Sequence, residues 1–242
     1  MQQYHPEKIL KEKERVGRIS QIRELVFGAQ DGLLVPLGVV SSVAGAFNNN
    51  HIVIVAGVAE ALAGAFSMAT GAFLASQAEK QVHLNEIEKE RREIKKYPKE
   101  EKEELALLFK EEGLSEKDAK DVVEILGKNA NAFFNTMVQK ELGLEPNPPD
   151  SPTKDAVFVG VSYLLSAIVP LFPYFFITGK EAIVFSILAT LVALFIIGIA
   201  KGRVASLPYL KSGLQVLLVG AGSGIGGYFL GIILPHVLGI SK

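Results

Sequence analysis

The sequence predicts an all-α membrane protein with five transmembrane helices and a cytoplasmic helical insert between the second and third helices. Three observations predict this class. Hydrophobic residues make up 49% of the 242 positions, even though 21% are charged. The charges are segregated, because 19 of the 26 acidic and 14 of the 25 basic residues lie in 79–155. Apolar segments of about 20 residues, the length that crosses a bilayer, lie on both sides of that charged stretch.

The five candidate spans are 25–47, 52–78, 156–177, 181–200 and 212–238. Lysine and arginine precede the first span, recur throughout the charged stretch and lie between the fourth and fifth spans. The loop at 46–51, between the first two spans, has neither. Because cytoplasmic loops carry an excess of basic residues, we expect the N-terminus and the insert in the cytosol and the C-terminus on the other side.

The chain is expected to divide into four parts. Residues 1–23 form a charged, amphipathic N-terminal segment without the apolar core of a cleaved signal peptide. Spans one and two occupy 24–78, the helical insert 79–153, and spans three to five 154–242. Three glycines of span two have a heptad spacing that is typical of close helix packing, either within one subunit or between subunits: Gly57, Gly64 and Gly71.

Span one contains an acidic residue and a proline in otherwise apolar sequence. Pro36 lacks an N–H group, so the carbonyl of Gly32 loses its helical partner and the helix is expected to kink. A freed carbonyl beside the carboxylate of Asp31 gives an oxygen-rich spot suited to a cation. In the alternative interpretation, Pro36 only bends the helix and Asp31 is hydrated near the surface.

Span two adds a second isolated carboxylate, because Asp31 and Glu60 are the only charged residues between Glu24 and Glu79. A carboxylate at the centre of a bilayer costs about 2.5 kcal/mol or more, so it usually faces a cavity, a partner or an ion path. Glu60 and Met68 point within roughly 80° of each other, about 12 Å apart along the axis, which suits two levels of one path. Methionine is most often core filler, although a thioether also helps to select transition metals.

The helix of span two is expected to continue to Lys96 and to stop at Pro98. Three shorter helices follow, at 99–112, 116–127 and 129–142, the second with Ser115 as its N-cap. The proline-rich stretch 144–153 returns the chain to the membrane. The residues expected to form the small core of the insert are apolar: Leu105, Leu108, Phe109, Val122, Ile125, Leu126, Phe133, Phe134 and Val138.

The insert also carries candidate metal ligands at helical spacing: Glu86, Glu90, Glu93, Glu101, Glu104, Met137 and Glu141. The first three lie on one helix face, and the Pro98 turn brings the next two back toward it, which would make a carboxylate metal site. The alternative is an ordinary solvated charged face. The chain has no cysteine, which excludes disulfides, thiolate zinc sites and iron–sulfur clusters. His83 is the only imidazole of the insert, and the Glu-x-x-His motif of ferritin-like di-iron sites is absent.

Several stretches resemble the vacuolar iron transporter family from about residue 20 to 235: FGAQDGLLVPLGVVSSVAGA, AGVAEALAGAFSMATGAFLASQAE, NTMVQKELGL, VPLFPYFF and ALFIIGIAKG. The resemblance implies five spans, a homodimer and a cytoplasmic metal-binding domain between spans two and three. It also implies that Fe²⁺, and often Mn²⁺, leaves the cytosol in exchange for protons.

The resemblance further implies a role for particular residues. Asp31, Glu60 and Met68 match the translocation residues of the family. The matches to the family's metal-binding domain are the remaining candidates: Glu90, Glu93, Glu101, Glu104, Met137 and Glu141. Glu86 is a helical neighbour of these, and a slip of one residue in the alignment would put Glu100 and Glu103 in place of Glu101 and Glu104.

The expected function is therefore that of a divalent-metal/proton antiporter rather than an enzyme, with Fe²⁺ as transported substrate and Mn²⁺, Co²⁺ or Zn²⁺ as further candidates. No tightly bound cofactor and no nucleic-acid partner are expected. The expected location is the cell membrane of a prokaryote, or the vacuolar membrane of a eukaryote. Two alternatives are a membrane-tethered carboxylate di-iron ferroxidase and a metal-sensing membrane protein whose intramembrane carboxylates are dispensable.

Overall fold

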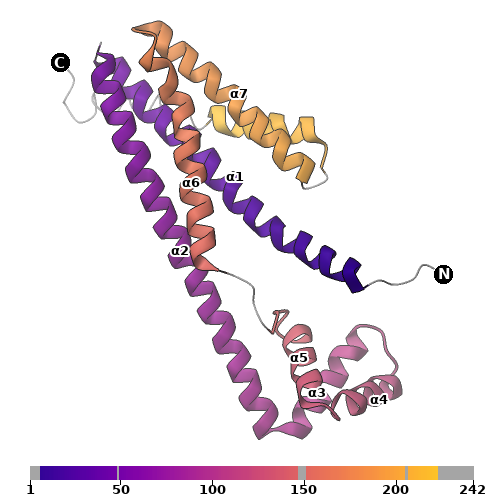
Figure 1. Cartoon of the computed structure of the whole chain (residues 1–242). Coiled ribbons are helices and arrows are strands. Elements are labelled where there is room, and N and C mark those ends of the chain that lie inside the picture. The colour runs from indigo at the N-terminus through magenta and orange to yellow at the C-terminus, as the bar shows by residue number, and fades with distance from the viewer. Residues whose placement is uncertain (1–5, 48, 147–150, 205–206, 223–242) are drawn as a thin grey trace. The chain divides into compact units, whose positions relative to one another are not determined.

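The computed structural model describes residues 6–47, 49–146, 151–204 and 207–222, and within these ranges the protein is helical without strands (Figure 1). The two longest helices come first, α1 (Pro6–Ala46) and α2 (Asn50–Lys96). Three short helices follow, α3 (Pro98–Glu111), α4 (Glu116–Leu126) and α5 (Ala130–Lys140). The chain then forms α6 (Pro152–Leu171), the 3-10 helix η1 (Phe172–Phe175) and α7 (Lys180–Val204), and residues 209–222 are again helical.

Within the described ranges, four helices are long and apolar enough to cross a membrane: Ile22–Ala46, Asn50–Lys96, Pro152–Phe175 and Lys180–Arg203. They correspond to the first four predicted spans, so the chain is a multi-pass, all-α protein. Of the fifth predicted span, 212–222 lies in the last described helix and 223–238 lies outside the described residues. The five-span count therefore stays a prediction. Helix α1 continues through Pro36 to Ala46, and Pro36 is buried.

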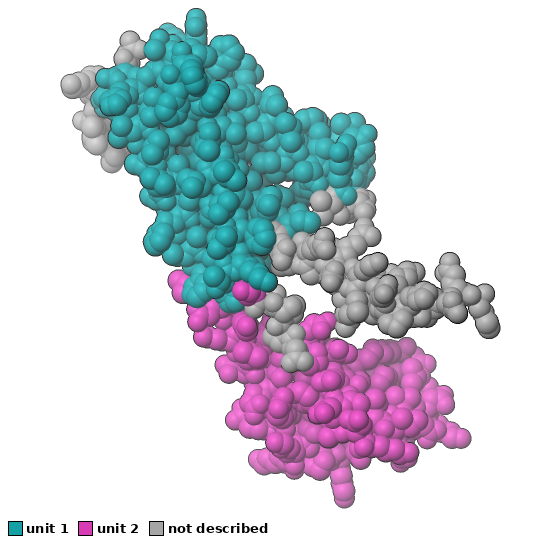
Figure 2. Space-filling model, viewed as in Figure 1, with its two compact units in different colours: residues 1–73, 152–242 teal, residues 74–151 magenta. Residues whose placement is uncertain are grey.

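The chain divides into two compact units, Met1–Phe73 with Pro152–Lys242 and Leu74–Ser151 (Figure 2). Helix α2 contributes its first part to one unit and its second part to the other. The four-part division that the sequence predicts, with the insert at 79–153 on the cytoplasmic side, stays a prediction.

Small residues allow the helices of the first unit to pack closely. A methyl group at Gly28 or Gly32 of α1 would overlap the backbone of α6, and at Gly32 it would lie 2.8 Å from the Cα atom of Tyr163. Of the heptad glycines in α2, Gly57 faces α1 and α6, with Val40 and Leu171 at 2.8 and 3.0 Å from its added methyl position. Close packing within one subunit therefore explains Gly57, as it does Gly64, whereas Gly71 has no neighbour within 4 Å.

The second unit folds around an apolar core supplied by α3, α4 and α5. Its buried members are Leu105, Ala106, Ala119, Val123, Phe133 and Met137. The prediction that Ile125 belongs to this core is wrong, because its side chain is 64% exposed. Helix α4 instead turns Val123, two residues earlier, toward α3 and α5, since residues two apart lie on different faces of a helix.

The N-termini of α4 and α5 are set by side-chain caps. Ser115 Oγ accepts the backbone N–H of Asp118 at 3.2 Å, so the predicted N-cap of α4 is confirmed. Asn129 caps α5 in the same way, since its Oδ1 accepts the N–H groups of Asn131 and Ala132 at 3.0 and 3.1 Å. These caps fix where the two helices begin.

Candidate metal centre

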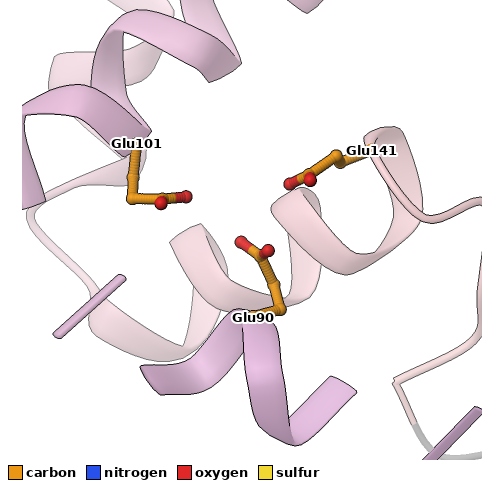
Figure 3. Close-up of side chains that lie close together, drawn as sticks. All are labelled: Glu90, Glu101 and Glu141. Atoms are coloured by element: carbon orange, nitrogen blue, oxygen red, sulfur yellow. The ribbon is translucent and has the colours of Figure 1, made fainter. Parts of the chain in front are cut away.

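Three glutamates from separate elements converge in the second unit (Figure 3). Glu90 comes from α2, Glu101 from the first turn of α3, and Glu141 caps the end of α5. Each offers a carboxylate oxygen, and these oxygens lie within 4.8 Å of one another. We call these three residues the glutamate cluster. Three anionic oxygens at this separation match the donor set that divalent cations such as Fe²⁺, Mn²⁺ and Mg²⁺ accept.

The turn between α2 and α3 places the first two glutamates face to face. Helix α2 ends at Lys96, and Pro98 starts α3 because a proline at the first helical position loses no hydrogen bond. The backbone N–H of Glu101 donates to the carbonyl of Tyr97 at 3.1 Å, which fixes the first turn of α3 beside the end of α2. Glu101 is thereby directed back at α2.

The third glutamate is positioned from the core. Met137 and Val138 are fully buried and anchor α5. The backbone N–H of Glu141 donates to the carbonyl of Met137 at 2.8 Å, one turn earlier. Because α5 is held by its buried residues, Glu141 reaches the cluster as the helix ends, and its side chain stays exposed to solvent.

Burial makes the glutamate cluster unusual for an acidic surface. Glu90 is only 2% exposed and Glu101 only 7%. Glu90 Oε1 and Glu101 Oε2 are buried without a hydrogen-bond partner among the described residues. A buried carboxylate oxygen without a donor is costly, whereas a bound cation or a proton would satisfy it. A solvated charged face, the alternative interpretation of the sequence, does not have this property.

The electrostatics of the cluster favour uptake of positive charge. Burial, together with the neighbouring Glu141 and Glu101 carboxylates, raises the pKa of Glu90 to about 8. Burial and the charge of Glu104 raise the pKa of Glu101 and also that of Glu141. Like charges this close cannot all ionise without a cation between them. The cluster can therefore exchange protons for a metal ion.

The other predicted ligands of the insert lie around the cluster rather than within it. Glu93 and Glu104 interact electrostatically with Glu101 and Glu141. Met137 is fully buried in the apolar core. Glu104 is exposed, and so are Glu86, Glu100 and Glu103. The structure thus buries Glu101, whereas Glu100 and Glu103, the residues that a shifted alignment would select, are exposed to solvent.

A second group of polar side chains lies among the apolar helices of the first unit. Glu60 of α2 and Asp31 of α1 are both partly buried. The Tyr163 hydroxyl of α6 donates to Glu60 Oε1 at 2.5 Å, and the Tyr163 phenol also interacts electrostatically with Asp31. Met68 is partly buried about two turns beyond Glu60 on α2. The sequence interpretation missed Tyr163; the available signal was a hydroxyl-bearing aromatic residue in an apolar span.

The sequence model of the VIT family matches residues 22–232 of this chain. Vacuolar iron transporter 1 of Arabidopsis thaliana is 34% identical over 216 residues, which are 89% of this chain and 86% of the relative. Vacuolar iron transporter 1 of Eucalyptus grandis is 37% identical, with coverage of 83% and 81%. The vacuolar iron transporter of Plasmodium falciparum is 29% identical, with coverage of 89% and 82%. These relatives are named as transporters, in agreement with the expectation that the chain is not an enzyme.

Proposed function

The chain belongs to the VIT family, and from this premise we propose that it is a metal/proton antiporter that moves Fe²⁺ out of the cytosol. The observation that carries the proposal is the glutamate cluster, with its two buried and unpartnered carboxylate oxygens. When such a site binds a divalent cation, its carboxyl groups release protons. It suits the capture of metal ions on the cytoplasmic side, where we expect the second unit to lie because of the distribution of basic residues.

The intramembrane residues are proposed to carry the ion across. Asp31 and Glu60 supply carboxylate oxygens in an apolar surrounding, and Met68 supplies a thioether that favours transition metals over Mg²⁺ and Ca²⁺. A carboxylate there is stabilised by a cation or by a proton, and the two compete for the same oxygens. Protons arriving from the far side would therefore release the metal, which couples the two flows. Mn²⁺, Co²⁺ and Zn²⁺ suit the same ligands and are proposed as weaker substrates.

The assembly proposed for this function is a homodimer in a lipid bilayer, with the N-terminus and the second unit in the cytosol. The direction of transport, away from the cytosol, is the same for a vacuolar membrane and for the cell membrane. The ferroxidase alternative has no observation in its favour, because no histidine joins the glutamate cluster in the described part of the chain.

The test is proton movement driven by Fe²⁺ in sealed proteoliposomes. We expect the wild type to move protons only when Fe²⁺ is supplied, and Asp31→Asn and Glu60→Gln to abolish that flux while assembly remains intact. Glu181→Gln, at an exposed position in the first turn of α7, is the matched control. Full activity of either intramembrane variant would overturn the assignment of the path. A folded, metal-binding wild type without flux would overturn antiport.

A further inference from the structure

Tyr163 is the polar partner that the structure gives to the isolated carboxylate of α2. Its side chain is only 2% exposed, and its hydroxyl donates to Glu60 Oε1 at 2.5 Å although the two residues are 103 positions apart in the chain. A phenol buried among apolar helices usually finds such a partner, because an unpaired hydroxyl in that environment is costly. The contact joins α6 to α2 at the level of Glu60.

Two glycines leave the space that the tyrosine occupies. A methyl group at Gly64, one turn after Glu60, would overlap the Tyr163 hydroxyl and lie 2.6 Å from the Cζ atom of the ring. A methyl group at Gly32, next to Asp31, would lie 2.8 Å from the Tyr163 Cα atom. The backbone of Tyr163 therefore lies against α1, while its ring and hydroxyl lie against Gly64 of α2, next to Glu60.

The two oxygens of Glu60 have different environments. Oε1 accepts from Tyr163, whereas Oε2 is buried without a partner among the described residues. A carboxylate held by one oxygen cannot rotate freely, so its other oxygen keeps one direction. The unpartnered Oε2 is thus the atom left to receive a cation.

We propose that Tyr163 is a positioning residue for transport, whose hydroxyl holds Glu60 Oε1 and so directs Oε2 at the passing metal ion. This inference rests on the proposed function of Glu60 as a translocation residue. Outer partners of metal ligands typically contribute 10- to 100-fold to metal affinity because they fix the ligand before the metal arrives. Tyr163 is expected to act in this way, without itself touching the ion.

The first test is the Tyr163→Phe variant of the full chain in proteoliposomes, which keeps the ring and removes only the donor. We expect the apparent KM for Fe²⁺ to rise about 10-fold, while the maximal rate changes less than about 2-fold. Tyr174→Phe is the control, because Tyr174 is equally buried and its hydroxyl bonds no carboxylate in the described part of the chain. An unchanged KM in Tyr163→Phe, or an equal rise in Tyr174→Phe, would overturn the proposal.

A second pair of variants leaves both Tyr163 and Glu60 in place. Gly64→Ala puts a methyl group where the Tyr163 hydroxyl lies, so the phenol must move off Glu60 and the KM should rise as in Tyr163→Phe. Gly71→Ala, one heptad further along α2, meets no atom within 4 Å and should leave the KM unchanged. Equal KM values for the two alanine variants would count against the positioning role.

Direct metal binding separates this inference from the proposed function. In a full chain whose glutamate cluster is neutralised by Glu90→Gln, Glu101→Gln and Glu141→Gln, the remaining Fe²⁺ affinity reports on the intramembrane site. We expect Tyr163→Phe to weaken it about 10-fold, and to have no further effect once Glu60→Ala is present. An additive loss in the Glu60→Ala background would overturn the positioning role. If the wild type bound Fe²⁺ but did not transport it, antiport would be overturned. The Fe²⁺ affinities with and without Tyr163→Phe would still decide the role of Tyr163.

Discussion

Glu90 and Glu101 show how burial turns acidic residues of a charged helix into a candidate metal site. The sequence around them is rich in glutamate, and most of these side chains are in solvent. Glu90 and Glu101 differ because they are buried and because one oxygen of each has no hydrogen-bond partner among the described residues. Their role as metal ligands remains a prediction, and two experiments on single residues address it.

The pH dependence of the second unit should report on Glu90. Its pKa is about 8 in the folded protein against an ordinary value of 4.5, so without metal the folded state binds the proton more tightly than the unfolded state. Stability should therefore fall as pH rises from about 4.5 to about 8. Glu90→Gln removes the contribution of Glu90 to this dependence, while Glu101 and Glu141, whose pKa values are also raised, keep theirs. Hydrogen exchange of α3–α5 should be slower in Glu90→Gln than in wild type at pH 8, and the difference should fade toward pH 5; a constant difference would contradict the assignment.

Metal affinity should distinguish Glu101 from its neighbours. Glu101→Gln is expected to weaken Fe²⁺ binding to the glutamate cluster by about 10-fold or more, because it removes one of three converging carboxylates. Glu100→Gln and Glu103→Gln, at exposed positions on the same helix, should have little effect. The measurement is titration of the full chain in detergent with the intramembrane carboxylates neutralised. A larger loss in Glu100→Gln would show that the alignment is shifted by one residue.

At the scale of elements, the contact between α1 and α6 organises the first unit. Two glycines of α1, Gly28 and Gly32, lie where the backbone of α6 comes close, and the same approach places Tyr163 between α1 and α2. The sequence predicted close packing from the glycines of span two. It did not predict that those of span one pack against a helix about 130 residues further along the chain.

Replacing Gly32 should therefore disrupt this contact. Gly32→Ala puts a methyl group 2.8 Å from a backbone atom of α6, which cannot rotate away as a side chain could. We expect the variant to lose about 1 to 3 kcal/mol of folding stability, measured by thermal unfolding in detergent. Gly38→Ala, on the same helix with no atom within 4 Å, should be neutral or slightly stabilising. Equal melting temperatures for the two variants would contradict the packing.

At the scale of the whole molecule, the arrangement in the membrane follows from where charge is and is not found. Four described helices are apolar enough to span, and the loop between the first two has no basic residue. The second unit carries most of the charge of the chain. Its cytoplasmic location is a prediction that can be tested directly, because the chain has no native cysteine.

Single cysteines should show on which side each part lies. Lys117→Cys, at an exposed position in the second unit, should react with a membrane-impermeant maleimide only from the cytoplasmic side. Asn49→Cys, at an exposed position between α1 and α2, should react only from the opposite side. The cysteine-free parent is the control for unspecific labelling. Labelling of both variants from one side would overturn the topology derived from the basic residues.

The sequence by itself determined the helical membrane class, the first four spans, the long second helix and the limits of the three short helices to within one or two residues. These properties depend on composition, periodicity and caps, which are local. Tertiary structure decided which face of α4 is buried, so Val123 rather than Ile125 joins the core. It also decided that Glu101 rather than Glu100 turns inward, and that Tyr163 reaches Glu60. Such pairings depend on how separate helices cross, and no local pattern specifies a crossing.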